Sequence, residues 1–253
     1  MERISILGVG VDNGSKQEVL EKITRLVADG KRHYIVTPNP EFVILAQKDK
    51  QFAKILAEAD LAVPDGVGLV LASRLLYGRK KSLRERVTGV DLMMEICRVA
   101  NKRHWSVFFL GAGEGVAEKC ARKFKERYGL AVVGTHSGWA DRLGDDENRL
   151  AIKKKIGLKG CHFIFVAYGA GKQEKWIKRN LAKIPVKVAV GVGGAFDFLS
   201  GEVNRAPEII RQFGLEWLWR LIKEPWRWRR QTALLKFVYL VAKEKFKSYS
   251  FFS

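Results

Sequence analysis

Three short apolar segments in the second half of the chain each run into a glycine-rich turn and then into a stretch with helical spacing. The segments are 107–110, 161–167 and 186–190. Strands that alternate with helices in this way build parallel sheets flanked by helices. Backbone N–H groups in such turns, together with the dipole of the following helix, form a site for anions. The pattern therefore predicts an α/β fold with a Rossmann-like, largely parallel sheet that binds a phosphate-bearing ligand.

Two turns in the first half of the chain carry polar side chains. The apolar run 61–63 leads into a turn with Asp65, and the run 34–36 leads into a turn with Thr37 and Asn39. Ligands of open α/β sheets bind outside the carboxyl ends of the strands, so we expect these three side chains at one edge of the sheet. Asp65 is then a candidate general base, and the alternative is that it only caps the helix after it.

The chain is strongly basic and has no obvious metal or disulfide framework. Its 253 residues include 46 Lys and Arg against 27 Asp and Glu, a formal net charge of +19. This excess favours anionic partners, namely nucleotide phosphates, an anionic membrane surface or nucleic acid. The three cysteines are widely spaced and form no C-x-x-C pair, which argues against a zinc site. The N-terminus begins as a strand rather than as a signal peptide, and the apolar runs are shorter than a membrane span.

The last fifty residues differ in composition from the rest. We expect an α/β catalytic core over 1–203 and a basic, helical appendage over 204–253 that holds four of the seven tryptophans. The helix expected there has an apolar row at Leu234, Phe237, Val238 and Val241. A separate basic row consists of Arg229, Lys236, Lys243 and Lys247. Such a helix is typical of a membrane-surface element, and the alternative is a helix packed on the core.

Two other functions fit parts of the sequence. The triplet Gly111, Ala112 and Gly113 resembles the start of a dinucleotide fingerprint, which would indicate an NAD(P)-binding oxidoreductase. However, Val116 stands where the third glycine belongs, and no acid follows the next strand, which ends near His136. His136 itself is predicted to be a loop histidine. The basic and aromatic residues could bind RNA, but no RNA-binding motif accompanies them, so we expect no nucleic acid.

Between the two halves lies a basic loop, 78–88, with the sequence GRKKSLRERVT. Lys80 and Lys81 in its middle are expected to be solvated. Arg84 and Arg86 are closer to the next helix, which begins near Gly89, so we expect at least one of them to point inward.

Seven stretches together resemble the WecG/TagA/CpsF family of bacterial glycosyltransferases. They occur in the family's order and span nearly the whole chain. The stretches are Thr37-Pro38-Asn39, Val63-Pro64-Asp65-Gly66, Glu85-Arg86-Val87-Thr88-Gly89, Lys172-Gln173-Glu174-Lys175-Trp176, Gly191-Val192-Gly193-Gly194-Ala195-Phe196-Asp197, Arg205-Ala206-Pro207 and Gly214-Leu215-Glu216-Trp217-Leu218. One departure is Gly171, where the family usually has proline.

The resemblance implies a substrate pair and a location. The family's teichoic-acid members transfer N-acetylmannosamine from its UDP form to undecaprenyl-diphospho-N-acetylglucosamine, in a β-1,4 linkage. By resemblance, this chain would use a UDP-sugar donor and an undecaprenyl-diphosphate-linked acceptor. It would act at the cytoplasmic face of the membrane as a peripheral protein. Whether the chain forms a homo-oligomer is left open by the sequence.

The chemistry and the resemblance together assign candidate residues. Inverting glycosyl transfer needs a base for the acceptor hydroxyl and a stabilised diphosphate leaving group. The candidate catalytic residues are Asp65, Thr37, Asn39 and Arg86. The candidate substrate-binding residues are Gly111, Ala112, Gly113, Gly169, Lys172, Gln173, Glu174, Gly193, Gly194, Asp197, Arg220, Arg227 and Arg230. The chain has no Asp-x-Asp tripeptide, so we expect no metal and no cofactor, with turn N–H groups and arginines meeting the diphosphate.

Overall fold

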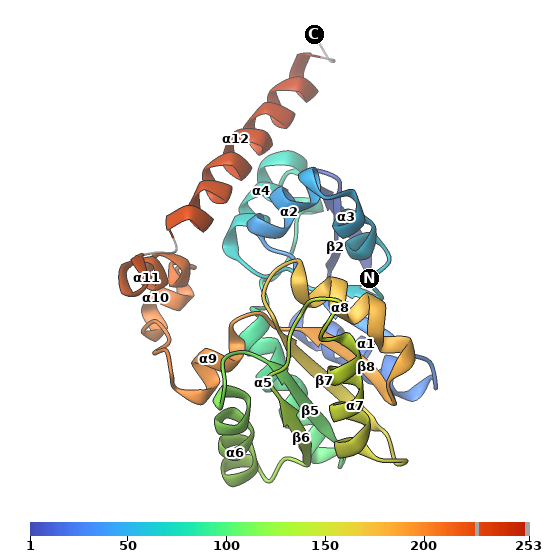
Figure 1. The fold of residues 1–253 in the computed structure, drawn as a ribbon. Coiled ribbons are helices and arrows are strands. Elements are labelled where there is room, and N and C mark those ends of the chain that lie inside the picture. Colours follow the sequence, from blue (N-terminus) through green and yellow to red (C-terminus); the bar gives the residue numbers. More distant parts are fainter. Residues whose placement is uncertain (226–227, 251–253) are drawn as a thin grey trace.

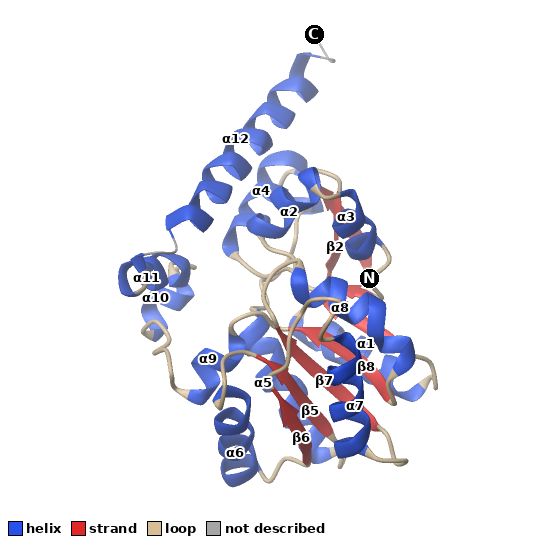
Figure 2. Cartoon of the chain, viewed as in Figure 1, coloured by secondary structure: helices blue, strands red, loops and turns tan. Residues whose placement is uncertain are grey.

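A six-stranded parallel sheet forms the centre of the computed structural model, which describes residues 1–225 and 228–250 (Figures 1 and 2). The strand order is β4-β3-β8-β7-β5-β6, and every neighbouring pair is parallel. The strands are β3 (His33–Val36), β4 (Leu61–Ala62), β5 (Val107–Gly111), β6 (Val132–His136), β7 (Cys161–Ala167) and β8 (Val186–Gly191). The predicted fold class is thus confirmed, and all six strands end at one edge of the sheet.

Helices cover both faces of this sheet, as Figure 1 shows. Those before the last strand are α1 (Lys16–Ala28), α2 (Pro40–Lys48), α3 (Lys50–Ala57), α4 (Val67–Tyr77), α5 (Gly89–Lys102), α6 (Val116–Tyr128), α7 (Asp145–Ile156) and α8 (Lys172–Asn180). After it come α9 (Ala195–Ser200), α10 (Glu208–Gln212), α11 (Glu216–Lys223) and α12 (Trp228–Ser250). Two short 3₁₀ turns lie at Arg79–Lys81 and Leu181–Lys183.

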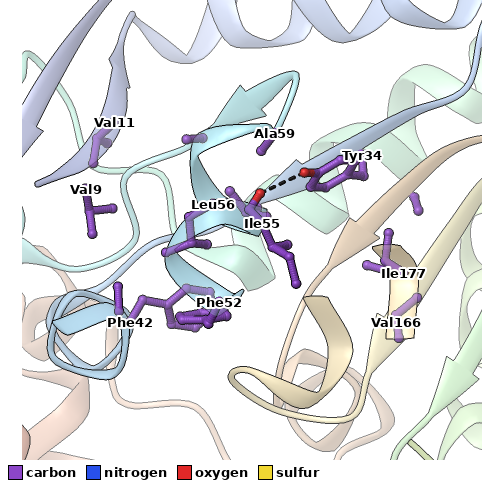
Figure 3. Packing of buried hydrophobic residues seen from close by; sticks show 14 of the residues in the cluster. Val9, Val11, Tyr34, Phe42, Phe52, Ile55, Leu56, Ala59, Val166 and Ile177 are labelled. Carbon is purple, nitrogen blue, oxygen red and sulfur yellow. Dashed lines mark hydrogen bonds between the residues drawn. The ribbon is translucent and has the colours of Figure 1, made fainter. Parts of the chain in front are cut away.

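Each face of the sheet has its own hydrophobic cluster. One cluster joins α2, α3, α7 and α8 to the sheet, and its largest side chains include Trp176 and Phe52. Figure 3 shows part of it, with the Tyr34 hydroxyl donating to the carbonyl of Ile55 at 2.7 Å. The other cluster joins α1, α5, α6 and α9 and includes Phe109, which packs against three other phenylalanines. Burial of each such side chain stabilises the fold by roughly 1.5–3 kcal/mol.

The N-terminal segment is built differently from the single buried strand that its apolar residues over 4–9 suggest. It forms an antiparallel hairpin, β1 (Glu2–Ile6) and β2 (Val9–Asn13), outside the main sheet. Leu7 and Gly8 both have positive φ, which is the geometry of the tight turns that suit twisted hairpins. The hairpin is tied to the sheet by Asp12, whose carboxylate accepts the N–H of Ala62 at 2.6 Å.

The last helix, α12, packs back onto the body of the protein. Phe237 and Val241 are buried in the cluster that α2 and α4 also line. The prediction that these two residues contact a membrane is therefore wrong, because both face the core. The alternative, a helix packed on the core, is correct for this side of α12. The opposite side of α12 carries another apolar row, made of Leu235, Tyr239 and Phe246, which are 74%, 62% and 72% exposed.

Within residues 1–225 and 228–250, no helix combines the length and apolar character that crossing a membrane requires.

Candidate active site

Four backbone segments converge at the carboxyl edge of β3, β4 and β8. Gly89 marks the meeting point, because a side-chain carbon there would lie 3.5 Å from Asp65 Oδ2 and 3.7 Å from Thr37 Oγ1. The same carbon would lie 3.6 Å from the carbonyl oxygen of Val192. The turns after three strands and the start of α5 thus enclose one small volume, as the open-sheet rule predicts.

Asp65 is held in this volume by its own backbone and by its neighbours. Its N–H donates to the carbonyl of Pro38 at 2.8 Å, and its Oδ2 accepts the N–H of Gly89 at 3.2 Å. The alternative that Asp65 caps the helix after it is wrong, because the N-cap residue of α4 is Gly66 and no side chain caps that helix. The carboxylate lies instead at the first residue of α5.

The environment of Asp65 gives it an unusual acidity. Burial raises its pKa to about 6, while the Gly89 N–H and the charge of Arg86 act in the opposite direction. The charges of Glu216 and Asp91 add to the increase. A carboxylate that titrates near neutral pH is well matched to accept a proton from a hydroxyl.

Thr37 and Asn39 lie at the same edge, as predicted, and each also supports the local structure. The buried Thr37 hydroxyl donates to the carbonyl of Gly191 at 3.1 Å, which joins β3 to β8. Asn39 caps α2 by accepting the N–H of Phe42 at 3.0 Å. Both side chains are therefore fixed in place, Thr37 near the Asp65 carboxylate and Asn39 near the next residue, Gly66.

The pair Gln173 and Glu174 is fully buried at the start of α8. Gln173 Nε2 donates to Glu174 Oε1 at 2.6 Å, and Gln173 Oε1 accepts the N–H of Gly193 at 2.9 Å. Glu174 Oε2 accepts the N–H of Gly171 at 2.7 Å. Burial raises the pKa of Glu174 to about 7 despite these hydrogen bonds. The pair links the turn after β7 to the turn after β8, whereas Lys172 is exposed.

The three glycine-rich turns follow strands that are neighbours in the sheet, β8, β7 and β5. Gly111 has a φ of +100°, and a side-chain carbon there would come within 2.9 Å of the backbone of Ala167. Ala112, which also has a positive φ, donates its N–H to the carbonyl of Ala167 at 3.0 Å. Beyond them, Gly113 is exposed and Gly169 is half-buried. The turns thus form a continuous row of backbone at the ligand-binding edge.

Arg220 reaches this row from the C-terminal segment. A side-chain carbon on Gly194 would lie 2.8 Å from Arg220 Nη1. The guanidinium also contacts Asp197 at 3.3 Å and Glu224 at 2.5 Å, and it lies over the ring of Phe198. Arg220, Gly194 and Asp197 are therefore together, as expected. Arg227 and the side chain of Arg230 lie outside the described residues.

Of the two arginines near the end of the basic loop, Arg86 is the one that turns inward. It is half-buried, and its Nη2 donates to the carbonyl of Arg211 at 2.9 Å. Arg84 is exposed and pairs with Glu18 at 3.4 Å. Lys80 and Lys81 are exposed, as expected.

Three charged residues near the site were not identified from the sequence. Arg205 pairs with Asp91 at 2.7 Å and with Glu216 at 3.1 Å. The sequence does indicate a local role for Asp91, because it follows the helix cap Thr88 by three residues. Its carboxylate accepts a hydrogen bond from the Thr88 hydroxyl at 2.7 Å. Arg205 and Glu216 lie in two of the family-like stretches, but nothing in the sequence shows that they meet.

The remaining candidates for metal or acid-base chemistry lie elsewhere. Among the residues that the structure describes, no cluster of three or more His, Cys, Asp or Glu side chains is arranged to hold a metal ion. All three cysteines are buried free thiols. His136 is the last residue of β6 rather than a loop residue, and its Nε2 is buried without a partner among the described residues.

Comparisons with known proteins give a consistent match over most of the chain. The model of the "Glycosyl transferase WecG/TagA/CpsF family" matches residues 4–251. An N-acetylglucosaminyldiphosphoundecaprenol N-acetyl-beta-D-mannosaminyltransferase of Bacillus subtilis (strain 168) is 32% identical over 243 residues, which cover 92% of this chain and 91% of the relative. A protein of the same name from Staphylococcus aureus (strain MRSA252) is 34% identical over 247 residues, which cover 97% and 94%. Another, from Bacillus spizizenii, is 34% identical and covers 88% and 83%.

Proposed function

The chain belongs to the WecG/TagA/CpsF family of glycosyl transferases, and we propose that it transfers N-acetylmannosamine from UDP-N-acetylmannosamine to undecaprenyl-diphospho-N-acetylglucosamine. The relatives at 32% and 34% identity are named for the transfer of an N-acetyl-β-D-mannosaminyl group to that lipid-linked acceptor. The observation in this chain that most supports the proposal is the position of Asp65. Its carboxylate, with a pKa of about 6, lies beside the glycine-rich turns at the ligand-binding edge.

In the proposed reaction, Asp65 accepts the proton of the acceptor hydroxyl as that oxygen attacks the anomeric carbon of the donor. The bond from that carbon to the UDP oxygen breaks on the opposite face, so the configuration inverts. Inversion of an α-linked donor gives the β linkage that the relatives' name specifies. A positioned general base contributes about 10²–10⁴-fold to such a step. Thr37 and Asn39, fixed beside Asp65, orient the sugar groups.

The departing diphosphate is assigned to the turns after β8, β7 and β5 and to Arg220. Backbone N–H groups and a guanidinium stabilise developing negative charge without a metal ion. Gln173 and Glu174 serve this site indirectly, because Gln173 Oε1 accepts the N–H of Gly193 and so fixes the backbone of the turn after β8. The chain therefore has its own hydrogen-bond donors for the negative charge of the diphosphate. Asp-x-Asp glycosyltransferases neutralise that charge with a metal ion instead.

A lipid-linked acceptor requires the site to work beside a membrane. We assign the membrane contact to the outer row of α12, Leu235, Tyr239 and Phe246, which is exposed on the side away from α2 and α4. The exposed Lys236 and Lys243 lie near that row on the helix. Basic residues close to an anionic surface contribute about 1 kcal/mol each. The proposed location is the cytoplasmic face of the membrane, with the protein bound peripherally.

The experiment that tests this function uses the purified chain, UDP-N-acetylmannosamine and a short-chain analogue of undecaprenyl-diphospho-N-acetylglucosamine. We expect a lipid-linked disaccharide with a new β linkage, detected by mass spectrometry and NMR, together with one equivalent of UDP. UDP-N-acetylglucosamine and UDP-glucose serve as matched donors and should give far less product. Binding of NAD in place of UDP, with no disaccharide from any of these donors, would overturn the proposal.

A further inference from the structure

A salt-bridged cluster joins the C-terminal segment to the core close to Asp65. Arg205 lies between α9 and α10, and its Nη1 is 2.7 Å from Asp91 Oδ1 on α5. Its Nε is 3.1 Å from Glu216 Oε1, and its Nη2 is 3.4 Å from Glu216 Oε2, on α11. One guanidinium thus bridges two helices that are far apart in sequence, and we call Asp91, Arg205 and Glu216 the arginine clasp.

The clasp is partly shielded from solvent, so its charges act strongly on one another. The side chains of Arg205 and Glu216 are each 17% exposed. Burial opposes the ionisation of Asp91, but the hydrogen bonds from Arg205 and Thr88 outweigh it and lower the pKa of Asp91. The carboxylate of Asp91 is therefore held in its ionised form by this pairing.

Both carboxylates of the clasp act on Asp65. The negative charges of Glu216 and Asp91 favour the protonated form of Asp65, whereas Arg86, from the loop before α5, favours the ionised form. Burial also favours the protonated form of Asp65, and the Gly89 N–H favours the ionised form. Arg205 is the cation that pairs with both of these carboxylates.

The clasp also fixes the helix that carries Arg220. Glu216 is the first residue of α11, and Arg220 lies four residues later on the same helix. From there Arg220 reaches Gly194 and Asp197 at the turn after β8. A second tie holds the same segment, since Arg86 donates to the carbonyl of Arg211.

We propose that Arg205 is a positioning residue for glycosyl transfer: it holds α11, and with it Arg220, against the turn after β8, and it cancels the negative charge of Asp91 and Glu216 beside the general base. This inference rests on the proposed function, in which Asp65 is that base. A salt bridge that served only stability would link α5 to α11 without affecting the ionisation of Asp65. The pH dependence of the reaction separates the two roles.

The test is the pH profile of kcat/KM for Arg205→Ala, measured between pH 5 and 9 with a water-soluble acceptor so that membrane binding plays no part. In this variant Asp91 and Glu216 no longer pair with Arg205. The acid limb of the profile, where activity falls as the pH is lowered, should then move to higher pH by about one unit, because nearby like charges raise the pKa of a carboxyl group. Turnover on the alkaline plateau should fall about tenfold or more, because Arg220 is no longer held in place. Arg205→Lys keeps the positive charge, so its acid limb should lie at the wild-type pH. Its turnover on the alkaline plateau should be only partly restored.

Two further variants separate charge from position. The triple variant Arg205→Ala/Asp91→Asn/Glu216→Gln should bring the limb back to or below its wild-type pH, while the plateau rate stays low. Glu216→Gln alone keeps the pair between Arg205 and Asp91, and it should move the limb to lower pH even if Arg205→Ala fails to fold. Arg98→Ala is the matched control, since it removes an exposed ion pair to Glu95 from the same helix, and it should leave the limb in place.

The possible results separate the role of Arg205 from the proposed glycosyl transfer. A limb that stays at the wild-type pH in both Arg205→Ala and Glu216→Gln, with only a lower melting temperature, would overturn the positioning role and leave the proposed function standing. If Asp65→Asn turned over like the wild type, another group would be the base, and the inference would fail while the transfer itself stood. If the wild-type chain made no disaccharide from any donor, the proposed function would fail.

Discussion

The carboxylate of Asp65 accepts a hydrogen bond from the backbone N–H of Gly89, with 3.2 Å between that nitrogen and Oδ2. Gly89 is the first residue of α5, so an acid from the turn after β4 is held at the positive end of a helix 24 residues further along the chain. The hydrogen bond favours the ionised carboxylate, but burial outweighs it and leaves the pKa at about 6. Asp65 is thus both fixed in position and able to exchange a proton near neutral pH.

The first prediction concerns pH. A general base works only when it is deprotonated, so transfer should be maximal above pH 6 and should fall about tenfold per unit below it. The raised pKa of Asp65 places this acid limb near pH 6 rather than near pH 4, where an exposed aspartate titrates. The limb is measured as kcat/KM against pH with a water-soluble acceptor. A flat profile from pH 5 to 8 would assign proton transfer to another group.

The second prediction compares three cations of the loop between α4 and α5. Arg86→Ala should lower kcat/KM at pH 7 roughly tenfold or more, because the charge of Arg86 favours the ionised form of Asp65 and its Nη2 holds the backbone at Arg211. Lys80→Ala and Lys81→Ala are matched controls on exposed positions of the same loop, with effects within about twofold. Equal, small effects at all three positions would show that Arg86 plays no part in catalysis.

The parts of the structure that depend on local pattern could be predicted from the sequence. Each strand of the main sheet has a run of apolar residues, and each ligand-facing turn is punctuated by glycine or proline. The hairpin was missed because Leu7 is apolar and adopts a positive φ that composition does not reveal. The helix α7 was missed because its apolar Leu150 is 70% exposed, which obscures the helical spacing of Ile152 and Ile156.

Relationships between distant segments could not be predicted in the same way. The row of apolar residues on α12 was identified by spacing, but spacing cannot show which side of the helix meets α2 and α4. Buried Phe237 and exposed Leu235 are only two residues apart. The bridge from Asp91 through Arg205 to Glu216 was invisible for the same reason, since its parts come from three separate segments. The acidity of Asp65 depends on this arrangement as well as on its own turn.

The third prediction concerns metal ions. Transfer should proceed in the presence of EDTA at close to its rate without chelator, because the glycine-rich turns and Arg220 offer donors to the diphosphate. The assay follows UDP release with EDTA, and then with added Mg²⁺ or Mn²⁺ as the control. Activity that vanishes with the chelator and returns with either metal would show that a metal ion carries the diphosphate charge.

The fourth prediction concerns membrane binding by α12. Replacing Leu235, Tyr239 and Phe246 together with serine should release the protein from anionic vesicles, because these side chains form the exposed apolar row. Turnover of a water-soluble acceptor should be unchanged. Leu71 and Leu75, which are 55% and 50% exposed on α4, provide a matched control when replaced with serine. Full vesicle binding by the α12 variant would assign the membrane contact to another surface.

Whether Asp65 is the base of a UDP-sugar transfer is tested by a paired measurement of turnover and UDP affinity on Asp65→Asn. Asparagine keeps the size of the side chain and removes only its ability to take a proton. We expect kcat to fall about 10²–10⁴-fold, while the affinity for UDP, measured by calorimetry on the same sample, stays within about twofold of the wild type. Near-native turnover by Asp65→Asn would remove Asp65 from the mechanism.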